Sequence, residues 1–416
     1  MDASADSKKS NLNELSPAIE LREAGKYQEA QEWLTRFIEN HSNDPEAFSL
    51  LSQVCLLDKK EVESEKALST AVSLDSELPS IFRNQARLLL KQSKPVEALG
   101  KAQLAYERSF DDPESHILLA ACLGLNQRDQ EALPLVEKVL EARPNYAEAF
   151  ANRAFIRMRA KDIFGAIKDA EVTVSIKPHF TKMWVILGSL RYQIKNLSGA
   201  IEALKKAHEN EPDNVGYMIN MAEILRQENK MGEAAVILKE AIKLAPGNAD
   251  ALNNLGVVFL GEGKFGEAKI AFEKALAINP KLADVLSNLG AIAMDARDWS
   301  SALQYFEKAL EVRPEFAGAH KNLGNTLQEL GRLEEAETSY RQAIAVKPDL
   351  AEAHNNLGNT LQELGRLEEA EASYRQAIAV KPDSAEAHSN MGNTLQELGR
   401  LEEAEASCRQ AIAVKP

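Results

Sequence analysis

Nine prolines of this chain stand 34 residues apart without interruption. They are Pro144, Pro178, Pro212, Pro246, Pro280, Pro314, Pro348, Pro382 and Pro416. A fixed period of this size indicates a repeat array rather than a domain with a single core. Because stacked copies bind ligands through a surface that they share, the informative residues are those that recur, or fail to recur, at one repeat position.

The period continues before the first of these prolines, although proline itself does not. Counting back from Pro144 in steps of 34 leads to Lys8, which leaves residues 1–8 as a flexible leader. The twelve predicted units are 9–42, 43–76, 77–110, 111–144, 145–178, 179–212, 213–246, 247–280, 281–314, 315–348, 349–382 and 383–416. The length would suit two or three ordinary domains, but the unbroken period predicts one elongated array.

Two rows of small residues run through all the units, twelve positions apart. The first row is Ala18, Ser52, Ala86, Ala120, Ala154, Gly188, Ala222, Gly256, Gly290, Gly324, Gly358 and Gly392. The second row is Ala30, Ser64, Ala98, Ala132, Ala166, Ala200, Ala234, Ala268, Ala302, Ala336, Ala370 and Ala404. Small residues inside helical patterns let two helices approach closely, so we expect two packed antiparallel helices in each unit.

Residues 349–382 illustrate how one unit is expected to fold. Asp349 is a good N-cap for the first helix, and Glu352 three residues later completes a capping box. Gly365 ends this helix, because a left-handed conformation is needed there. A second apolar stripe begins at Leu367 and runs until Pro382 stops it. Each unit is therefore predicted to be a helix-turn-helix, and the fold to be all-α.

The recurring pattern of this unit consists of Asn356, Leu357, Gly358, Gly365, Ala370, Tyr374, Ala377 and Pro382, and similar residues recur over essentially the whole chain. This pattern resembles the tetratricopeptide repeat. The resemblance implies a right-handed α-solenoid superhelix, with first helices on the concave wall and second helices on the convex wall. Six early units lack the turn glycine and carry Lys59, Ser93, Gln127, Lys161, Lys195 and Asn229 instead. These replacements are expected to weaken the turns without moving the register.

The eighth position of each unit, just before a recurring leucine, is expected to face the concave groove. Its residues are Ser16, Leu50, Asn84, Leu118, Asn152, Ile186, Asn220, Asn254, Asn288, Asn322, Asn356 and Asn390. Asparagine is a mediocre helix former, so helix propensity does not explain six in succession. Its amide offers one acceptor and two donors, which match the backbone of an extended peptide whatever its side chains.

The six final asparagines predict a peptide-binding wall. A similar asparagine ladder is found in the repeat region of O-GlcNAc transferases and SPINDLY-type enzymes, where it holds protein substrates; the resemblance concerns the ladder positions only. Polar neighbours extend the wall: Asn325, Asn359, Asn393, Gln328, Gln362, Gln396, Glu329, Glu363 and Glu397. Two alternatives remain open. In the first, the ladder amides bond to one another or to neighbouring helix ends instead of a ligand. In the second, the polar neighbours are only a solvated helix face.

The middle units place apolar residues at or beside the ladder position. These residues are Ile117, Leu118, Val185, Ile186 and Ile219. If they face the groove, such a strip would accept a partner helix or a second copy of the chain. The alternative is ordinary packing against the adjacent repeat.

The charge of the chain argues against nucleic acid as a partner. The formal net charge is −14, and residues 315–416 contribute half of it, with 17 acidic and 10 basic residues. Such an excess repels phosphate backbones.

Cysteine usage and the start of the chain favour a cytoplasmic protein. Cys55, Cys122 and Cys408 lie at three different repeat positions and share no metal-type or redox spacing, so we interpret them as small packing residues. The segment Met1 to Ser10 is polar and lacks the apolar core of a secretory leader. The longest apolar stretches, such as Ile117 to Leu125, are too short to span a bilayer, so membrane insertion is not expected.

No cofactor, metal or catalytic residue is predicted. His320, His354 and His388 recur every 34 residues, but equivalent helices lie about 8–10 Å apart, whereas zinc needs its ligands at about 2 Å. We therefore assign these histidines, and Trp184 at the same repeat position, to helix packing. The glutamates of the second helices, such as Glu368, Glu369 and Glu371, are interpreted as a solvated face. No phosphate-binding loop or nucleophile elbow interrupts the repeats.

The sequence supports a non-catalytic scaffold that binds extended polypeptide along the asparagine-lined groove. A second hypothesis is that the array is the substrate-recruiting arm of a larger glycosyltransferase or sulfotransferase, because the last repeat ends on Pro416 without a capping helix. A third is self-association, through the apolar strip or through the uncovered edge of the last repeat.

Overall fold

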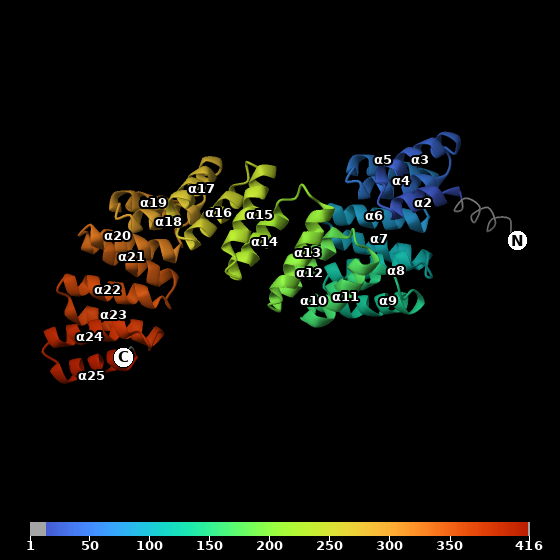
Figure 1. The fold of residues 1–416 in the computed structure, drawn as a ribbon. Helices are drawn as coiled ribbons and strands as arrows, with labels where there is room; N and C mark the ends of the chain where they lie inside the picture. Colours follow the sequence, from blue (N-terminus) through green and yellow to red (C-terminus); the bar gives the residue numbers. More distant parts are fainter. Residues whose placement is uncertain (1–13, 415–416) are drawn as a thin grey trace. The chain divides into compact units, whose positions relative to one another are not determined.

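The computed structural model describes residues 14–414, so the leader 1–8, the start of the first unit and Pro416 lie outside the described part. In that part the chain forms 24 helices, arranged as consecutive hairpins, and no strand (Figure 1). The first helices are α2 (Ser16–Glu23), α4 (Pro45–Leu57), α6 (Pro79–Lys91), α8 (Pro113–Leu125), α10 (Ala147–Arg159), α12 (Thr181–Gln193), α14 (Gly216–Gln227), α16 (Ala249–Gly261), α18 (Ala283–Asp295), α20 (Ala317–Glu329), α22 (Ala351–Glu363) and α24 (Ala385–Glu397). The second helices are α3 (Tyr27–Asn40), α5 (Glu61–Leu74), α7 (Pro95–Arg108), α9 (Asp129–Ala142), α11 (Ile163–Ile176), α13 (Leu197–Asn210), α15 (Met231–Leu244), α17 (Phe265–Ile278), α19 (Trp299–Val312), α21 (Leu333–Val346), α23 (Leu367–Val380) and α25 (Leu401–Val414). The predicted all-α fold of helical hairpins is confirmed.

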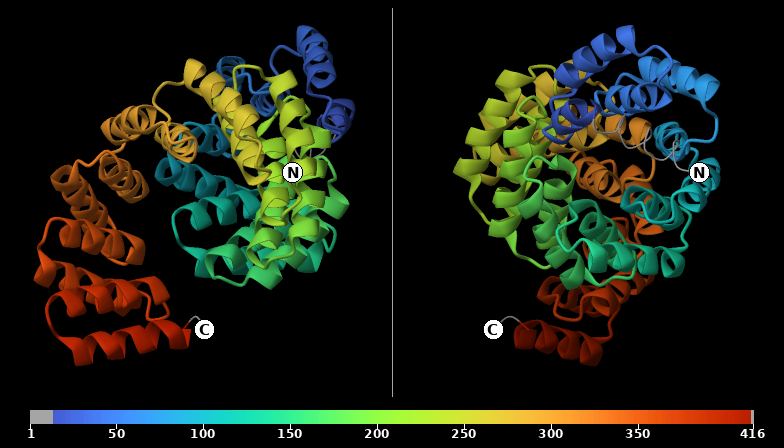
Figure 2. Two further views of the ribbon diagram at one scale, coloured as in Figure 1. Left: turned by 60° about the vertical axis from the view of Figure 1, so that its left-hand side comes forward. Right: turned by 90° about the vertical axis from the view of Figure 1, so that its right-hand side faces the viewer.

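The helices group into two compact units, and the division between them in the sequence falls at a repeat boundary. One unit ends at Glu211 and the other begins at Pro212. Within each unit a second helix packs against the first helix of the next hairpin, as α21 does on α22 and α23 on α24 (Figure 2). We describe each unit by itself. One continuous array over residues 9–416, with a right-handed superhelical twist, remains a prediction.

The start of the first helix differs from the capping-box prediction. In residues 349–382 the N-cap is Leu350, which makes no side-chain capping bond, and the helix begins at Ala351. A turn precedes it, in which the Leu350 amide donates to the Lys347 carbonyl at 3.3 Å. The predicted N-cap Asp349 is therefore wrong, because this turn after the proline shifts the helix start two residues past it.

Side-chain caps are present elsewhere along the chain. The residues that accept hydrogen bonds from first-turn amides of first helices are Asp44, Asp112, Asn248 and Ser384. Asp162, Asn196 and Asp298 do the same for second helices. All seven capping residues stand at the second or the eighteenth position of their unit, so a helix is capped only where an Asp, Asn or Ser occupies that position.

Every hairpin turns through one residue with positive φ, as the turn-glycine pattern predicts. Glycine fills this place at Gly25, Gly263, Gly331, Gly365 and Gly399, with φ between +72° and +77°. Other residues fill it at Lys59, Ser93, Gln127, Lys161, Lys195, Asn229 and Arg297, with φ between +57° and +62°. The sequence interpretation had missed Arg297. Since side chains other than glycine are strained in this conformation, the turn geometry is imposed by the packing of the two helices and not by the turn residue alone.

Glycines of the first row make room for aromatic rings sixteen residues later. A Cβ added to Gly324 would lie 2.6 Å from the Tyr340 ring, and one added to Gly358 would lie 2.5 Å from the Tyr374 ring. Gly256 and Gly290 stand in the same relation to Phe272 and Phe306, at 2.5 and 2.7 Å. These four rings are fully buried. At these four places a glycine of the first row is therefore matched in size to a large aromatic residue sixteen positions later. The sequence analysis did not relate these two positions.

Candidate functional site

The asparagines proposed for peptide binding all lie in the second unit, on its first helices. Asn220, Asn254 and Asn288 belong to α14, α16 and α18. The other six come in pairs one turn apart: Asn322 and Asn325 on α20, Asn356 and Asn359 on α22, Asn390 and Asn393 on α24. Asn220 and Asn393 are exposed and the others half-buried. We call these nine residues the amide face.

Two ladder asparagines are tied to the preceding repeat. Asn356 donates from Nδ2 to Asn325 Oδ1 at 2.9 Å, and Asn390 donates to Asn359 Oδ1 at 2.9 Å. In each bond the donor is a ladder asparagine. The acceptor is in the preceding repeat, three residues after the ladder position of that repeat. For these two residues the alternative interpretation, that the amides satisfy one another, describes what is observed.

The remaining ladder amides of the second unit have no such partner. At the place where Asn325 and Asn359 serve as acceptors, the repeats before Asn288 and Asn322 carry Val257 and Ala291. In residues 14–414 no side-chain hydrogen bond is found for Asn220, Asn254, Asn288 or Asn322. Their donors and acceptors are therefore available to a ligand.

Asn325 and Asn359 are held by tyrosines of their own repeats. Tyr340 lies 2.8 Å from Asn325 Oδ1, and Tyr374 lies 2.7 Å from Asn359 Oδ1, in each case through the hydroxyl. Both oxygens thus receive two hydrogen bonds, one from the tyrosine and one from the ladder asparagine of the next repeat. Within the described residues, neither Nδ2 group donates a hydrogen bond to the protein.

The glutamines and glutamates beside the amide face are partly tied to each other. Gln328 donates to Glu363 at 2.6 Å, and Gln362 donates to Glu397 at 2.5 Å. Asn355, next to the ladder, likewise donates to Glu386 at 2.9 Å. These contacts join neighbouring first helices, so the flanking residues are more than a solvated face.

Two earlier ladder positions do not resemble the amide face. Asn84 is 2% exposed and donates to the Ser49 carbonyl at 2.7 Å and to Ser49 Oγ at 2.9 Å, while its Oδ1 accepts from Arg87. Asn152 donates to the carbonyl of Glu148 in its own helix. Both amides are engaged inside the first unit, which excludes Asn84 from direct contact with a ligand.

The five residues of the apolar strip do not form one surface. Ile117 and Leu118 are only 7% and 8% exposed and belong to a core cluster with Val136 and Ile156. Their burial agrees with ordinary packing, and these two side chains offer little surface to a partner. Val185 and Ile186 on α12 are half-buried, and Ile186 packs on the core. Ile219 is half-buried on α14 in the other unit.

The recurring histidines bond to the backbone just before their own helices, and not to one another as ligands of a shared metal ion. Nε2 of His320, His354 and His388 lies 2.8, 2.9 and 3.1 Å from the carbonyl oxygen of the proline six residues earlier. Trp184 Nε1 makes the equivalent bond to Pro178 at 2.7 Å. A carbonyl oxygen can only accept, so in these contacts each histidine donates and carries a proton on Nε2. In residues 14–414 no group of three or more His, Cys, Asp or Glu side chains could hold a metal ion.

Of the three second-helix glutamates interpreted as a solvated face, Glu368 and Glu369 are exposed but Glu371 is buried. Glu371 is 8% exposed and pairs with Arg375 and Arg400, each at 2.6 Å. Arg366 likewise contacts Glu337 of the preceding repeat at 2.6 Å, and its hydrogen bonds lower the pKa of Glu369 in its own repeat. Glu371 is therefore part of an ion-pair row between repeats.

The first unit contains an ionic cluster that the sequence analysis missed. Glu114 on α8 lies 2.9 Å from Arg87 and 3.7 Å from both Arg83 and Arg22, so it connects α8 with α6 and α2. Burial alone would raise the pKa of Glu114, but the three guanidinium groups outweigh it and lower the pKa to about 2. These four residues occupy four different repeat positions, so no periodic signal reveals the cluster.

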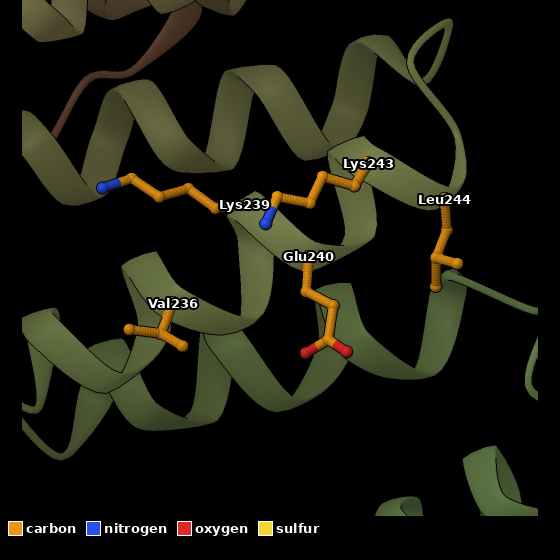
Figure 3. Close-up of a pocket in the computed structure, with 5 residues that line it drawn as sticks. All are labelled: Val236, Lys239, Glu240, Lys243 and Leu244. Atoms are coloured by element: carbon orange, nitrogen blue, oxygen red, sulfur yellow. The ribbon is translucent and has the colours of Figure 1, made fainter.

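One further hollow lies on α15. It has a volume of about 460 Å³ and is lined by Val236, Lys239, Glu240, Lys243 and Leu244 (Figure 3). It contains none of the nine amide-face residues. Within the described residues no helix is both long and apolar enough to cross a membrane.

Comparisons with protein families identify the repeat. Models described as tetratricopeptide repeat match residues 283–316 and 385–416, 305–338, and 18–79. A model described as TPR repeat matches residues 327–365 and 358–399. The model of the cytochrome c-type biogenesis protein H TPR domain matches residues 172–284. No curated protein sequence matches the chain.

Three solved structures are similar to parts of this chain. MamA is 24% identical over 39% of this chain and 94% of its own, with a TM-score of 0.37. YrrB, described as a TPR protein with an unusual peptide-binding site, is 28% identical over 45% of this chain and 96% of its own, with a TM-score of 0.39. The pilF protein of Pseudomonas aeruginosa is 20% identical over 49% of this chain and 92% of its own, with a TM-score of 0.45.

Proposed function

We propose that this chain, which carries tetratricopeptide repeats in both of its units, is a non-catalytic scaffold that binds extended polypeptide along the amide face. The observation that carries the proposal is the set of amide groups without a protein partner. Asn254, Asn288 and Asn322 make no side-chain hydrogen bond in the described residues, and they recur at one position of consecutive first helices. Half-buried amides gain by pairing with a ligand, because an unpaired polar group is costly to desolvate.

The chemistry of the face suits a polypeptide backbone. Each free amide offers two N–H donors and one carbonyl acceptor, which match the carbonyl and N–H groups of a peptide in any sequence. The three cysteines are free. Free thiols are usual in a reducing compartment, and we include a cytoplasmic location in the proposal.

The test compares two sets of asparagines on the same face. The first set, Asn254, Asn288 and Asn322, is changed to Ala together, and binding of an uncharged, unstructured twelve-residue peptide is measured by calorimetry. We expect each lost hydrogen bond to weaken binding by about 0.5–1.5 kcal/mol, without lowering the thermal stability. The second set, Asn356 and Asn390, joins repeats, and its change to Ala should lower the stability of the second unit as well.

A matched control carries the same number of amides on the second helices. Gln304, Gln342 and Gln376 are exposed on α19, α21 and α23, and their joint change to Ala should leave binding unchanged. Equal affinities of the wild type and the Asn254, Asn288 and Asn322 variant would remove these residues from the proposed function.

A second candidate function is a substrate-recruiting arm of a larger protein-modifying transferase. The six-fold ladder favours it, because a similar ladder holds substrates in O-GlcNAc transferases and SPINDLY-type enzymes. The measurement is transfer of N-acetylglucosamine or sulfate to a protein substrate by the longest polypeptide that the gene encodes. Peptide binding without any transfer would leave only the scaffold function.

A further inference from the structure

Two buried tyrosines contact the amide face from behind. Tyr340 and Tyr374 are fully buried, with their rings against Gly324 and Gly358. A phenol has a single hydrogen to donate. The shorter contact of Tyr340, 2.8 Å, is to Asn325 Oδ1, whereas its contact to Gln328 is 3.2 Å. Burial raises the pKa of both tyrosines, so the hydroxyls remain protonated donors at neutral pH.

Both repeats that carry the tyrosine also carry the asparagine, whereas in residues 383–416 Asn393 is found with Cys408 at the ring position and lacks a tyrosine. In the two repeats before that of Tyr340 the ring position is Phe272 or Phe306, and the place of Asn325 is taken by Val257 or Ala291. Phenylalanine fills the space beside Gly256 and Gly290 as well as tyrosine fills it beside Gly324. Packing therefore does not require the hydroxyl. In both repeats the hydroxyl contacts two amides, the asparagine at 2.8 or 2.7 Å and a glutamine at 3.2 or 3.3 Å, and the shorter contact is to the asparagine.

The two bonds fix the direction in which the amide donates. Asn325 Oδ1 receives Tyr340 and Asn356, so rotating the amide by half a turn would break both bonds. The Nδ2 hydrogens of Asn325 then keep a single orientation, with no protein acceptor among the described residues. Asn359 is held in the same way by Tyr374 and Asn390.

We propose that Tyr340 and Tyr374 are positioning residues, which hold the Asn325 and Asn359 amides so that each receives a backbone carbonyl of the bound polypeptide. This inference rests on the proposed function and adds a row of fixed donors beside the ladder. A donor held in place loses less freedom on binding than a rotating one, so it contributes more to affinity.

The repeat spacing indicates which ligand conformation fits this row. The two fixed donors lie on α20 and α22, which contact each other and are joined by the bond between Asn356 and Asn325. Helices in contact lie about 8–10 Å apart, so we take about that distance as the spacing of the two donors. A polyproline II segment advances about 9.3 Å in three residues, and every third carbonyl returns to the same side. A β-strand returns a carbonyl to the same side after two residues, about 6.7 Å. The ligand class is therefore a polypeptide in the polyproline II conformation, contacted at every third residue.

The first experiment removes only the hydroxyls. The Tyr340→Phe, Tyr374→Phe double variant keeps the rings, as Phe272 and Phe306 do naturally, and we expect it to bind a twelve-residue proline-rich peptide about three- to tenfold more weakly. Phe306→Tyr is the matched control: it adds a hydroxyl opposite Ala291, where no amide can be held, and should leave binding unchanged.

A double-mutant cycle separates positioning from a structural role. In a protein that already carries Asn325→Ala and Asn359→Ala, the two Tyr→Phe changes should have no further effect on binding, whereas a loss of stability would act in both backgrounds. Unchanged binding in Tyr340→Phe, Tyr374→Phe, or an equal loss in both backgrounds, would overturn the inference.

A third comparison tests the ligand conformation. A proline-rich peptide and an uncharged Thr/Val-rich peptide of equal length are titrated into the wild-type chain, and the proline-rich one should bind at least about fivefold more tightly. Equal affinities, or tighter binding of the Thr/Val-rich peptide, would overturn the polyproline II assignment. If neither peptide binds the wild type, the proposed function itself fails, which distinguishes that outcome from failure of the inference.

Discussion

The two units share one repeat but use their first helices differently. In the first unit the polar groups of these helices bond to one another: Glu114 holds three arginines, and Asn84 is buried against Ser49. In the second unit the ladder amides from Asn254 to Asn322 have no protein partner in the described residues. The same face therefore stabilises the fold in one unit and is left open in the other. The comparison shows that repeat position alone does not assign a role; the partner of each side chain does.

The largest loss of stability is expected when glycines of the first row are replaced by alanine in the second unit. Gly324→Ala with Gly358→Ala would push a methyl group into the Tyr340 and Tyr374 rings, at a cost of about 1–3 kcal/mol per site in the free energy of unfolding. Chemical denaturation followed by circular dichroism measures this loss.

The matched change in the first unit is Gly188→Ala. There the nearest atom to a new Cβ is Leu204 Cγ at 3.3 Å, and alanine gains about 1 kcal/mol in helix propensity over glycine. We expect little change or a small gain in stability. A loss at Gly188 as large as that at Gly358 would refute the size matching between the glycine row and the aromatic rings.

The next largest effect is expected for the ionic cluster around Glu114 in the first unit. The folded pKa of Glu114 is about 2, below its ordinary 4.5, so its stabilisation is complete above about pH 4.5 and is lost as the pH falls toward 2. The shift corresponds to about 2–3 kcal/mol, allowing for partial exposure. Acid unfolding followed by Trp33 and Trp184, in a Trp299→Phe background, reports on the first unit.

The Glu114→Gln variant serves as the control for this experiment. It lacks the titrating carboxylate, so its stability at neutral pH should already be reduced and should change less between pH 5 and 2. The neutral amide face of the second unit should show no comparable dependence. An acid transition of the first unit that is identical in Glu114→Gln and wild type would contradict the role assigned to the cluster.

The smallest effect concerns the hairpin turns. Four of the six turns of the second unit use glycine at positive φ, but only Gly25 does so in the first unit. Gly365→Ala should therefore cost about 1–2 kcal/mol, whereas Gln127→Ala replaces one strained residue by another and should change stability by less than about 0.5 kcal/mol. Arg297→Gly should gain about 0.5–1 kcal/mol. Thermal unfolding of the three variants tests whether the turns differ as described.

The period predicts the hairpins and their turns because both depend on residues that recur. Gly365 ends its helix as expected, and the second helix stops at Val380, just before Pro382. The N-cap at Asp349 was wrong because the turn after Pro348 sets the helix start. Glu371 appeared solvated in the sequence, since only the position of Arg400 in the next repeat shows that it is buried and paired.

The candidate site was found only in part for the same reason. The ladder identifies the helix face, but whether an amide is free depends on the residue that the preceding repeat places beside it. Asn356 is tied because Asn325 is present, and Asn322 is free because Ala291 replaces that acceptor. Comparing each ladder residue with its neighbour one repeat earlier would have revealed the difference. The Glu114 cluster combines four unrelated positions, so a three-dimensional arrangement was needed to find it.

The joint between repeats also bears on how such an array grows. In the hydrogen-bonded chain from Tyr340 through Asn325 to Asn356, one repeat supplies the acceptor and the next supplies the donor. Because each of these repeats carries both an acceptor and a donor, a tandem copy inserted beside its parent finds a complementary neighbour on either side. Gene duplication can therefore lengthen this part of the chain without compensating mutations at the new junction, and every added copy extends the binding surface by the same step.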